Sequence, residues 1–116
     1  MDMSVEKLPD EVTRIVLAGS LDIKGAAAVE VPFTTVAGKS SRVVVDCTAV
    51  DFVASIGLRL LVGTARTISR RGGKLVLCGV TPPVAKILTV AGMDGLLPSF
   101  ASSDAALAAV KAGAPG

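Results

Sequence analysis

The pattern of hydrophobic and polar positions predicts four strands in residues 3–79. Residues 13–17 (TRIVL) follow a turn-like Leu-Pro-Asp at 8–10 and predict a strand, with residues 3–6 as its antiparallel hairpin partner. The β-branched run 42–47 (RVVVDC) and the similar run 74–79 (KLVLCG) do not alternate strictly, as expected for strands that are covered on both faces. We therefore expect an antiparallel edge and two central strands.

Between the two central runs the period becomes helical. Apolar residues recur on one side of the segment, arginines lie on the other, and a Gly-Gly pair ends it. The apolar positions are Leu58, Leu61, Val62, Ala65 and Ile68, and the arginines are Arg59, Arg66 and Arg70. A strand, a helix and a second strand in this order form a βαβ unit, which predicts that the two central strands are parallel.

The C-terminal part predicts two more helices and a short strand. Pro82 opens a helix that stops at Gly92, because proline suits the first helical turn and glycine suits the residue after the last. Residues 96–100 predict a short edge strand, and Ser-Ser-Asp at 102–104 provides the cap of a terminal helix. We expect residues 1–112 to form a single domain and residues 113–116 to be a frayed tail.

The segment from Ile23 to Gly38 has the small and apolar residues of a helix, but it contains Pro32. Proline removes a backbone donor and clashes with the preceding turn. We therefore expect this helix to be interrupted between Glu30 and Pro32. The fold class that these elements define is α/β, a mixed sheet of four to five strands flanked by about four helices.

Composition narrows the possible functions. A chain of 116 residues, 51% apolar and 19% charged, has the size and balance of one folded domain. Its apolar stretches end well before the ~18 residues of a membrane span, and its acidic N-terminus lacks the pattern of a signal peptide, which predicts no membrane insertion and a cytoplasmic location. A net charge of +2 with no Tyr or Trp gives no basis for direct nucleic-acid binding.

Residues with catalytic or metal-binding chemistry are scarce. The chain has no histidine, and its only cysteines, Cys47 and Cys78, are expected to be buried reduced thiols, so no metal site or cofactor is expected. Glycine-rich phosphate loops and the GxSxG nucleophile motif are absent. Asp46 and Asp51 are interpreted as solvated or capping carboxylates. These observations predict that the protein is not an enzyme.

The most informative stretch is residues 51–58 (DFVASIGL), which we expect to be a loop joining the first central strand to the crossover helix. Ser55 lies where an N-cap belongs, and a capping hydroxyl alone would explain a serine there. Ser55 also lies at the carboxyl end of a parallel strand, where open α/β sheets usually place functional residues. Phosphorylation would add a charge of about −1.5 to −2, which a helix N-terminus tolerates but a docked partner would not. The residues alone leave both interpretations open.

Several segments, in order, resemble STAS domains of the bacterial anti-sigma factor antagonist family. The matching segments are LAGSLD at 17–22, VVVDC at 43–47, FVASIGL at 52–58, GGKLVL at 72–77, PPVAKIL at 82–88 and AGM at 91–93. The resemblance implies a STAS-like fold, no catalysis, and binding of an anti-sigma factor that is also a serine kinase. It implies that Ser55 accepts the phosphate, that Asp22 lies near the partner surface, and that a serine phosphatase resets the switch.

The family usually has an acidic residue before the phosphorylated serine and a second hydroxyl residue after it, whereas this chain has Ala54 and Ile56. Three hypotheses follow. The first is a phospho-regulated antagonist, the second is a constitutive STAS scaffold or a regulatory subunit of a transporter or signalling complex, and the third is a small enzyme or ligand carrier. The expected partner-binding residues are Asp22, Ala54, Ser55, Ile56, Gly57, Leu58 and Arg59.

Overall fold

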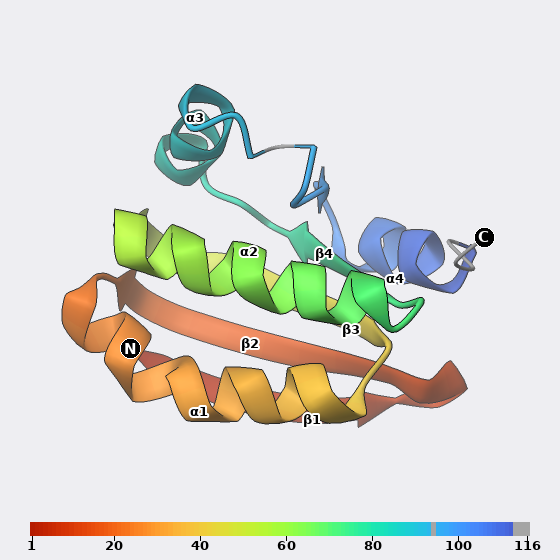
Figure 1. The fold of residues 1–116 in the computed structure, drawn as a ribbon. Coiled ribbons are helices and arrows are strands. Elements are labelled where there is room, and N and C mark those ends of the chain that lie inside the picture. Colours follow the sequence, from red (N-terminus) through yellow and green to blue (C-terminus); the bar gives the residue numbers. More distant parts are fainter. Residues whose placement is uncertain (94, 113–116) are drawn as a thin grey trace.

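The computed structural model describes residues 1–93 and 95–112, so the expected tail at 113–116 lies outside the described residues. A five-stranded mixed sheet is flanked by four helices, as predicted (Figure 1). The strands are β1 (Asp2–Leu8), β2 (Val12–Leu21), β3 (Arg42–Val53), β4 (Lys74–Cys78) and β5 (Ser99–Phe100). The helices are α1 (Ile23–Lys39), α2 (Ser55–Arg70), α3 (Pro82–Val90) and α4 (Ser103–Ala112), and a short 3-10 helix spans Pro9–Glu11.

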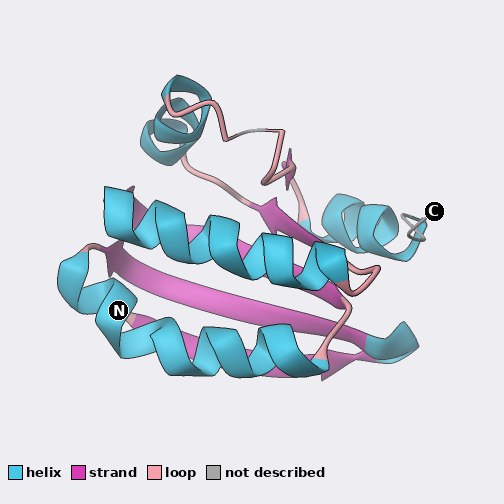
Figure 2. Ribbon diagram, in the orientation of Figure 1, coloured by secondary structure: helices cyan, strands magenta, loops and turns pink. Residues whose placement is uncertain are grey.

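The strands are arranged in the sheet in the same order as in the chain, β1 to β5 (Figure 2). β1 pairs antiparallel with β2, which confirms the predicted hairpin at the edge. β3 pairs parallel with both β2 and β4, which confirms the predicted parallel pair joined by a crossover helix. The predicted C-terminal edge strand is present but short, and it runs parallel to β4.

β3 is longer than the sequence pattern suggested. The prediction that residues 51–53 begin a loop is wrong, because β3 continues to Val53 and pairs with β2 as far as Leu21. Two register shifts in the β2–β3 ladder, between Val16 and Ala18 and between Gly19 and Ser20, allow the pairing to continue. Such irregularities break the simple two-residue period, so the strand does not show in the pattern of apolar positions.

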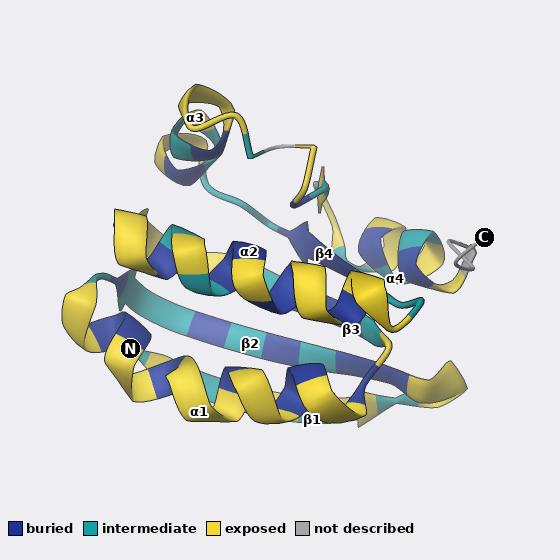
Figure 3. Ribbon diagram, in the orientation of Figure 1, coloured by how far each residue is buried: buried dark blue, intermediate teal, exposed yellow. Residues whose placement is uncertain are grey.

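The predicted interruption of the first helix is also wrong, because α1 continues through Pro32. Pro32 is exposed, whereas Val29, Phe33 and Val36 are buried in the core. Figure 3 shows exposed and buried positions alternating along α1. Interior proline costs a helix roughly 3 kcal/mol. Burial of three large apolar side chains contributes about 1.5–3 kcal/mol each, which is enough to hold the helix together across the proline.

The two faces of the sheet are covered by different helices. α1 and α2 lie side by side over one face, where the larger core includes Ile15, Phe33, Val45 and Ile68 (Figure 1). α4 covers part of the opposite face through Ala106 and Val110, which pack with residues of β2, β3 and β4. No helix in the described part of the chain is long and apolar enough to cross a membrane.

Cys47 and Cys78 are buried free thiols, as predicted. They lie in the two separate core clusters and therefore on opposite faces of the sheet. Burial, assisted by the nearby Cys78 and Asp46, raises the pKa of Cys47 from 9.0 to about 12. Burial and then Asp46 also raise the pKa of Cys78, while Arg14 opposes the shift.

The raised pKa of Cys47 predicts a loss of stability in alkali. Between pH 9 and 12 the unfolded chain releases the thiol proton while the folded chain keeps it, so the free energy of unfolding falls as the pH rises, by at most about 1.4 kcal/mol per pH unit for this group. Urea unfolding at pH 8 to 10.5 should show a shallower decline in Cys47→Ala than in wild type. Equal declines in the two proteins would show that Cys47 is not the source of the loss. Lysine ionisation is common to both proteins, so its effect cancels in the comparison.

Candidate functional site

The carboxyl ends of β2 and β3 bring the two expected site segments together. Leu21 pairs with Val53, and the amide of Ala54 donates a 3.0 Å hydrogen bond to the carbonyl of Leu21. Each strand then leads directly into a helix, β2 into α1 and β3 into α2. Asp22 and Ser55 therefore lie at the same edge of the sheet, beside two neighbouring helix N-termini.

Ser55 is the first residue of α2, and the N-cap is Ala54, which has no side chain able to cap. The interpretation of Ser55 as the capping residue is therefore wrong by one position. Ser55 is exposed, and its hydroxyl forms no hydrogen bond within residues 1–93 and 95–112. A role in capping no longer explains the serine, which leaves its hydroxyl available for chemistry or contact with a partner.

Asp22, in contrast, has a clear structural role. It is the N-cap of α1, and its Oδ1 accepts a 2.8 Å hydrogen bond from the amide of Gly25. The side chain is half-buried, so one carboxylate oxygen is committed to the helix start. Any contribution of Asp22 to partner binding would come in addition to this cap.

Ser55 lines a shallow groove of about 380 Å³ between the start of α2 and the outer side of α3. From β3 and α2 the groove receives Val53, Ser55 and Leu58, and from α3 it receives Pro83, Lys86, Ile87, Val90 and Ala91. None of the α3 residues was among the site residues predicted from the sequence. Val90 could have indicated the α3 residues, because it is an apolar residue off the apolar face of the predicted helix. In the structure it is 79% exposed.

Exposed apolar side chains gather around the same edge. Ile23 begins α1, Phe52 is the penultimate residue of β3, and Ile56 follows Ser55; they are 72%, 47% and 43% exposed. Val90 extends this set across the groove. Exposed apolar residues that cluster, rather than scatter, mark surfaces that bind other molecules. Ala54 is half-buried, so the exposed Ile56 presents the larger apolar surface beside Ser55.

Gly57 packs the first turn of α2 against the end of β2. It is buried, and a Cβ atom built there would lie 2.5 Å from the carbonyl oxygen of Leu21 and 2.6 Å from its Cγ. Only glycine lets the first turn of α2 approach the end of β2 this closely. Gly57 therefore positions Ser55 and does not itself present a side chain to a partner.

Arg59 faces a different groove from Ser55. With Glu30, Thr34 and Leu60 among its neighbours, it lines a hollow of about 340 Å³ between α1 and α2. Leu58 lies on the Ser55 side. Arg59 therefore does not line the Ser55 groove and lies instead on the side of α2 that faces α1.

The two aspartates of β3, Asp46 in the middle of the strand and Asp51 near its end, are engaged in local hydrogen bonds. Asp46 Oδ1 accepts bonds from the amide and the hydroxyl of Thr48, at 2.9 and 2.6 Å. Asp51 Oδ1 accepts a 2.7 Å bond from the hydroxyl of Ser20. Within the described residues no three His, Cys, Asp or Glu side chains come together in a way that could hold a metal ion. The site therefore presents a hydroxyl and apolar surface.

Comparison with known proteins identifies the family. A family model described as "Mlab, STAS domain" matches residues 4–98. The chain belongs to the STAS domain family. This STAS domain is 29% identical over 116 residues to the Bordetella bronchiseptica protein named "Putative anti-sigma factor antagonist BtrV", with 99% of each chain covered.

Solved structures of the same fold include regulators named in similar terms. A crystal structure of an anti-sigma factor antagonist from Mycobacterium paratuberculosis has a TM-score of 0.84 and 27% identity to this STAS domain, covering 95% of this chain and 93% of that one. The Bacillus cell fate determinant SpoIIAA in its phosphorylated form shares the fold at a TM-score of 0.70 and 20% identity, covering 90% of this chain and 96% of that one.

Proposed function

We propose that this STAS domain is an anti-sigma factor antagonist, a cytoplasmic protein-binding switch without enzymatic activity. In this proposal it sequesters an anti-sigma factor with serine-kinase activity while Ser55 is unphosphorylated, and a serine phosphatase resets it after phosphorylation. The observation that carries the proposal is the exposed, uncommitted hydroxyl of Ser55 beside an apolar groove. It binds no cofactor and no nucleic acid directly.

The position of Ser55 suits a switch that acts on binding without unfolding the domain. Phosphate adds a charge of about −1.5 to −2, and the N-terminus of α2 favours negative charge by roughly 0.3–1 kcal/mol. Lys86, which lines the same groove, adds a positive charge within the site. A partner packed over Ile87 and Val90 would instead have to bury the phosphate against an apolar surface, at a cost of several kcal/mol.

Ala54 and Ile56 support a second candidate, a constitutive STAS scaffold or regulatory subunit. Ala54 offers no carboxylate for recognition by a kinase, and the exposed Ile56 enlarges the apolar surface that would hold a permanent partner. Under this alternative the complex forms and persists whatever occupies position 55. The two candidates therefore differ in whether Ser55 gains a phosphate and whether that phosphate releases the partner.

Phosphorylation can be tested by intact-mass measurement. Wild type and Ser55→Ala would each be incubated with ATP and a candidate anti-sigma factor kinase, and binding would be followed in the same samples. We expect one added phosphate on wild type, none on Ser55→Ala, and release of the kinase only from wild type. A complex that forms but gains no phosphate would overturn the phospho-switch in favour of the constitutive module.

A further inference from the structure

The opposite end of the sheet holds a second, larger hollow. It has a volume of about 700 Å³ and lies where β2, β3 and β4 begin, away from Ser55. Its walls come from the ends of β1 and α1, the loops before β3 and β4, and α4. The lining residues that carry charge are Lys7, Glu11, Lys39, Arg42 and Lys74. Four cations against one carboxylate give the hollow a local charge of +3.

This local charge exceeds the net charge of the whole chain, which is +2. The remainder of the molecule is therefore slightly negative, and the positive charge is concentrated at one place. The cations reach it from three separate stretches of the chain, at position 7, at positions 39 and 42, and at position 74. Such convergence raises the local concentration of anions well above what a net charge of +2 spread over the surface would give.

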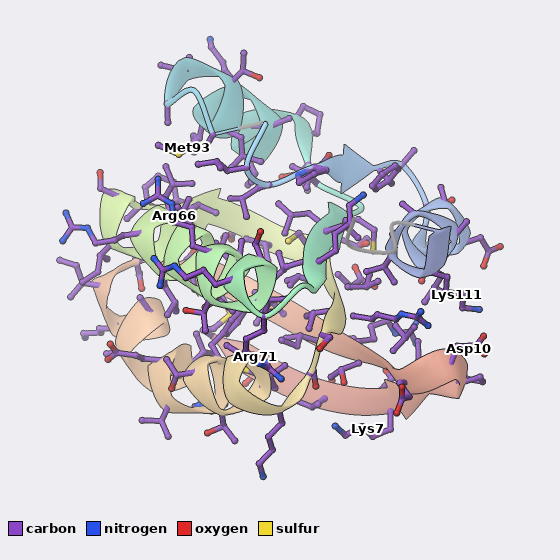
Figure 4. The ribbon with its side chains drawn as sticks, turned by 45° about the vertical axis from the view of Figure 1, so that its right-hand side comes forward. Lys7, Asp10, Arg66, Arg71, Met93 and Lys111 are labelled. Carbon is purple, nitrogen blue, oxygen red and sulfur yellow. The ribbon has the colours of Figure 1, made fainter. Side chains whose placement is uncertain are left out.

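Neighbouring contacts strengthen the positive field. Asp10 lies close by, but Lys111 of α4 pairs with its carboxylate at 3.1 Å, and Figure 4 shows the two side chains next to each other. Arg42 donates a 2.9 Å hydrogen bond to the carbonyl of Asp10, which holds its guanidinium in place with other N–H donors still free to bind a ligand. Asp10 therefore does not neutralise the hollow.

Two helix C-termini oppose anion binding here, and nearby cations offset their negative charge. α1 and α2 both end at this side, and each C-terminus carries about half a negative charge. Arg71 donates hydrogen bonds to the carbonyls of Ala37 and Ser40, so a full positive charge covers the end of α1 (Figure 4). Lys39 and Arg70 occupy the last turns of α1 and α2. The cations at this end outweigh the two half charges.

The hollow also contains buried hydroxyl groups. Thr13 and Ser40 are 3% and 6% exposed, and their hydroxyls share one 2.8 Å hydrogen bond. The two hydroxyls carry two hydrogens, and their shared bond uses one of them. Within the described residues the second hydrogen has no other acceptor, so it can be donated to a ligand. Ser41 adds an exposed hydroxyl at the edge. Ammonium, guanidinium and hydroxyl donors together match the oxygens of a phosphate chain.

We propose that this basic hollow is a binding site for an oligophosphate, either the phosphate chain of a nucleotide or inorganic polyphosphate. Among the described residues its apolar lining consists of Leu8, Val12 and Val110, and none of the lining side chains has an aromatic ring on which a base could stack. Recognition therefore rests on the phosphates, and the site is separate from the Ser55 groove.

The test is calorimetric titration with sodium tripolyphosphate and, separately, with ATP, at 50 and 200 mM salt. The double variant Lys39→Gln/Lys74→Gln removes two lining charges, and Lys24→Gln/Arg66→Gln removes two exposed charges that lie outside the hollow. We expect the first pair to weaken Kd for tripolyphosphate about tenfold, a change of 1.4 kcal/mol, and the second pair to change it less than twofold. Thermal unfolding of both variants verifies that they fold.

Comparison of the two ligands identifies the source of the phosphate. Equal affinity for tripolyphosphate and ATP assigns recognition to the phosphate chain alone, and tighter binding of ATP assigns the site to nucleotides. Equal weakening by both double variants would overturn the proposal, because it would mean diffuse attraction to a cationic surface. Absence of saturable binding at 50 mM salt would overturn it as well.

Discussion

Ser55→Glu is expected to weaken binding of the anti-sigma factor strongly while leaving the fold intact. The new carboxylate would stand at the first position of α2, where the helix dipole tolerates it, but it would face an apolar groove formed with α3. A charge at the centre of an interface commonly costs 2 kcal/mol or more, so we expect Kd to rise about 30-fold or further. Binding can be measured by calorimetry with the purified partner.

The chain provides a matched control for this substitution. Ser69 is another exposed serine on α2, in the last turn of the same helix and far along it from the groove. Ser69→Glu should leave Kd unchanged within about twofold, since it adds the same charge outside the proposed surface. Wild-type affinity in Ser55→Glu, or equal losses in both variants, would show that the groove beside Ser55 is not where the partner binds.

Gly57→Ala is expected to destabilise the domain and disturb the site together. The added methyl would have to displace the carbonyl and side chain of Leu21, and overpacking of this kind costs about 1–3 kcal/mol. The movement would fall on the first turn of α2, which carries Ser55, so partner affinity should fall with stability. Urea unfolding gives the stability change, and calorimetry gives the affinity.

Gly63 supplies the comparison for Gly57. It lies on the same helix, and a Cβ atom built there meets nothing within 4 Å. Alanine favours helix over glycine by up to about 1 kcal/mol, so Gly63→Ala should leave stability unchanged or raise it. If Gly57→Ala proved as harmless as Gly63→Ala, the close approach of α2 to Leu21 would not be what fixes the site.

Local patterns were enough to predict most of the fold. Alternating and β-branched runs located β1 to β4, and the helical spacing of Leu61, Ala65 and Ile68 located α2, because these patterns come from one residue's position relative to its neighbours in the chain. The unbroken α1 was not predicted, since the burial of Phe33 that sustains it depends on a sheet assembled from distant segments. The same holds for the end of β3, whose pairing with β2 relies on register shifts.

The candidate site was predicted at two places along the chain, Asp22 and residues 54–59. Ser55 and its neighbours were found because a strand end, a helix start and a resemblance coincide there. The α3 wall of the groove and the basic hollow were missed, because both arise where segments far apart in sequence meet. Lys7, Lys39 and Lys74 show this well: they lie in separate parts of the sequence, and only the arrangement of the strands brings them together.

The short connection that carries Ser55 is fixed at both ends, by the hydrogen bond from Ala54 to Leu21 and by the packing of Gly57 on the same residue. A partner would therefore meet a surface already in its bound shape, with little entropy lost on ordering a loop. Association should then proceed without a slow conformational step, and the backbone should move little on binding. Under these conditions a phosphate on Ser55 would act mainly by shortening the lifetime of the complex, so its effect should appear in the dissociation rate.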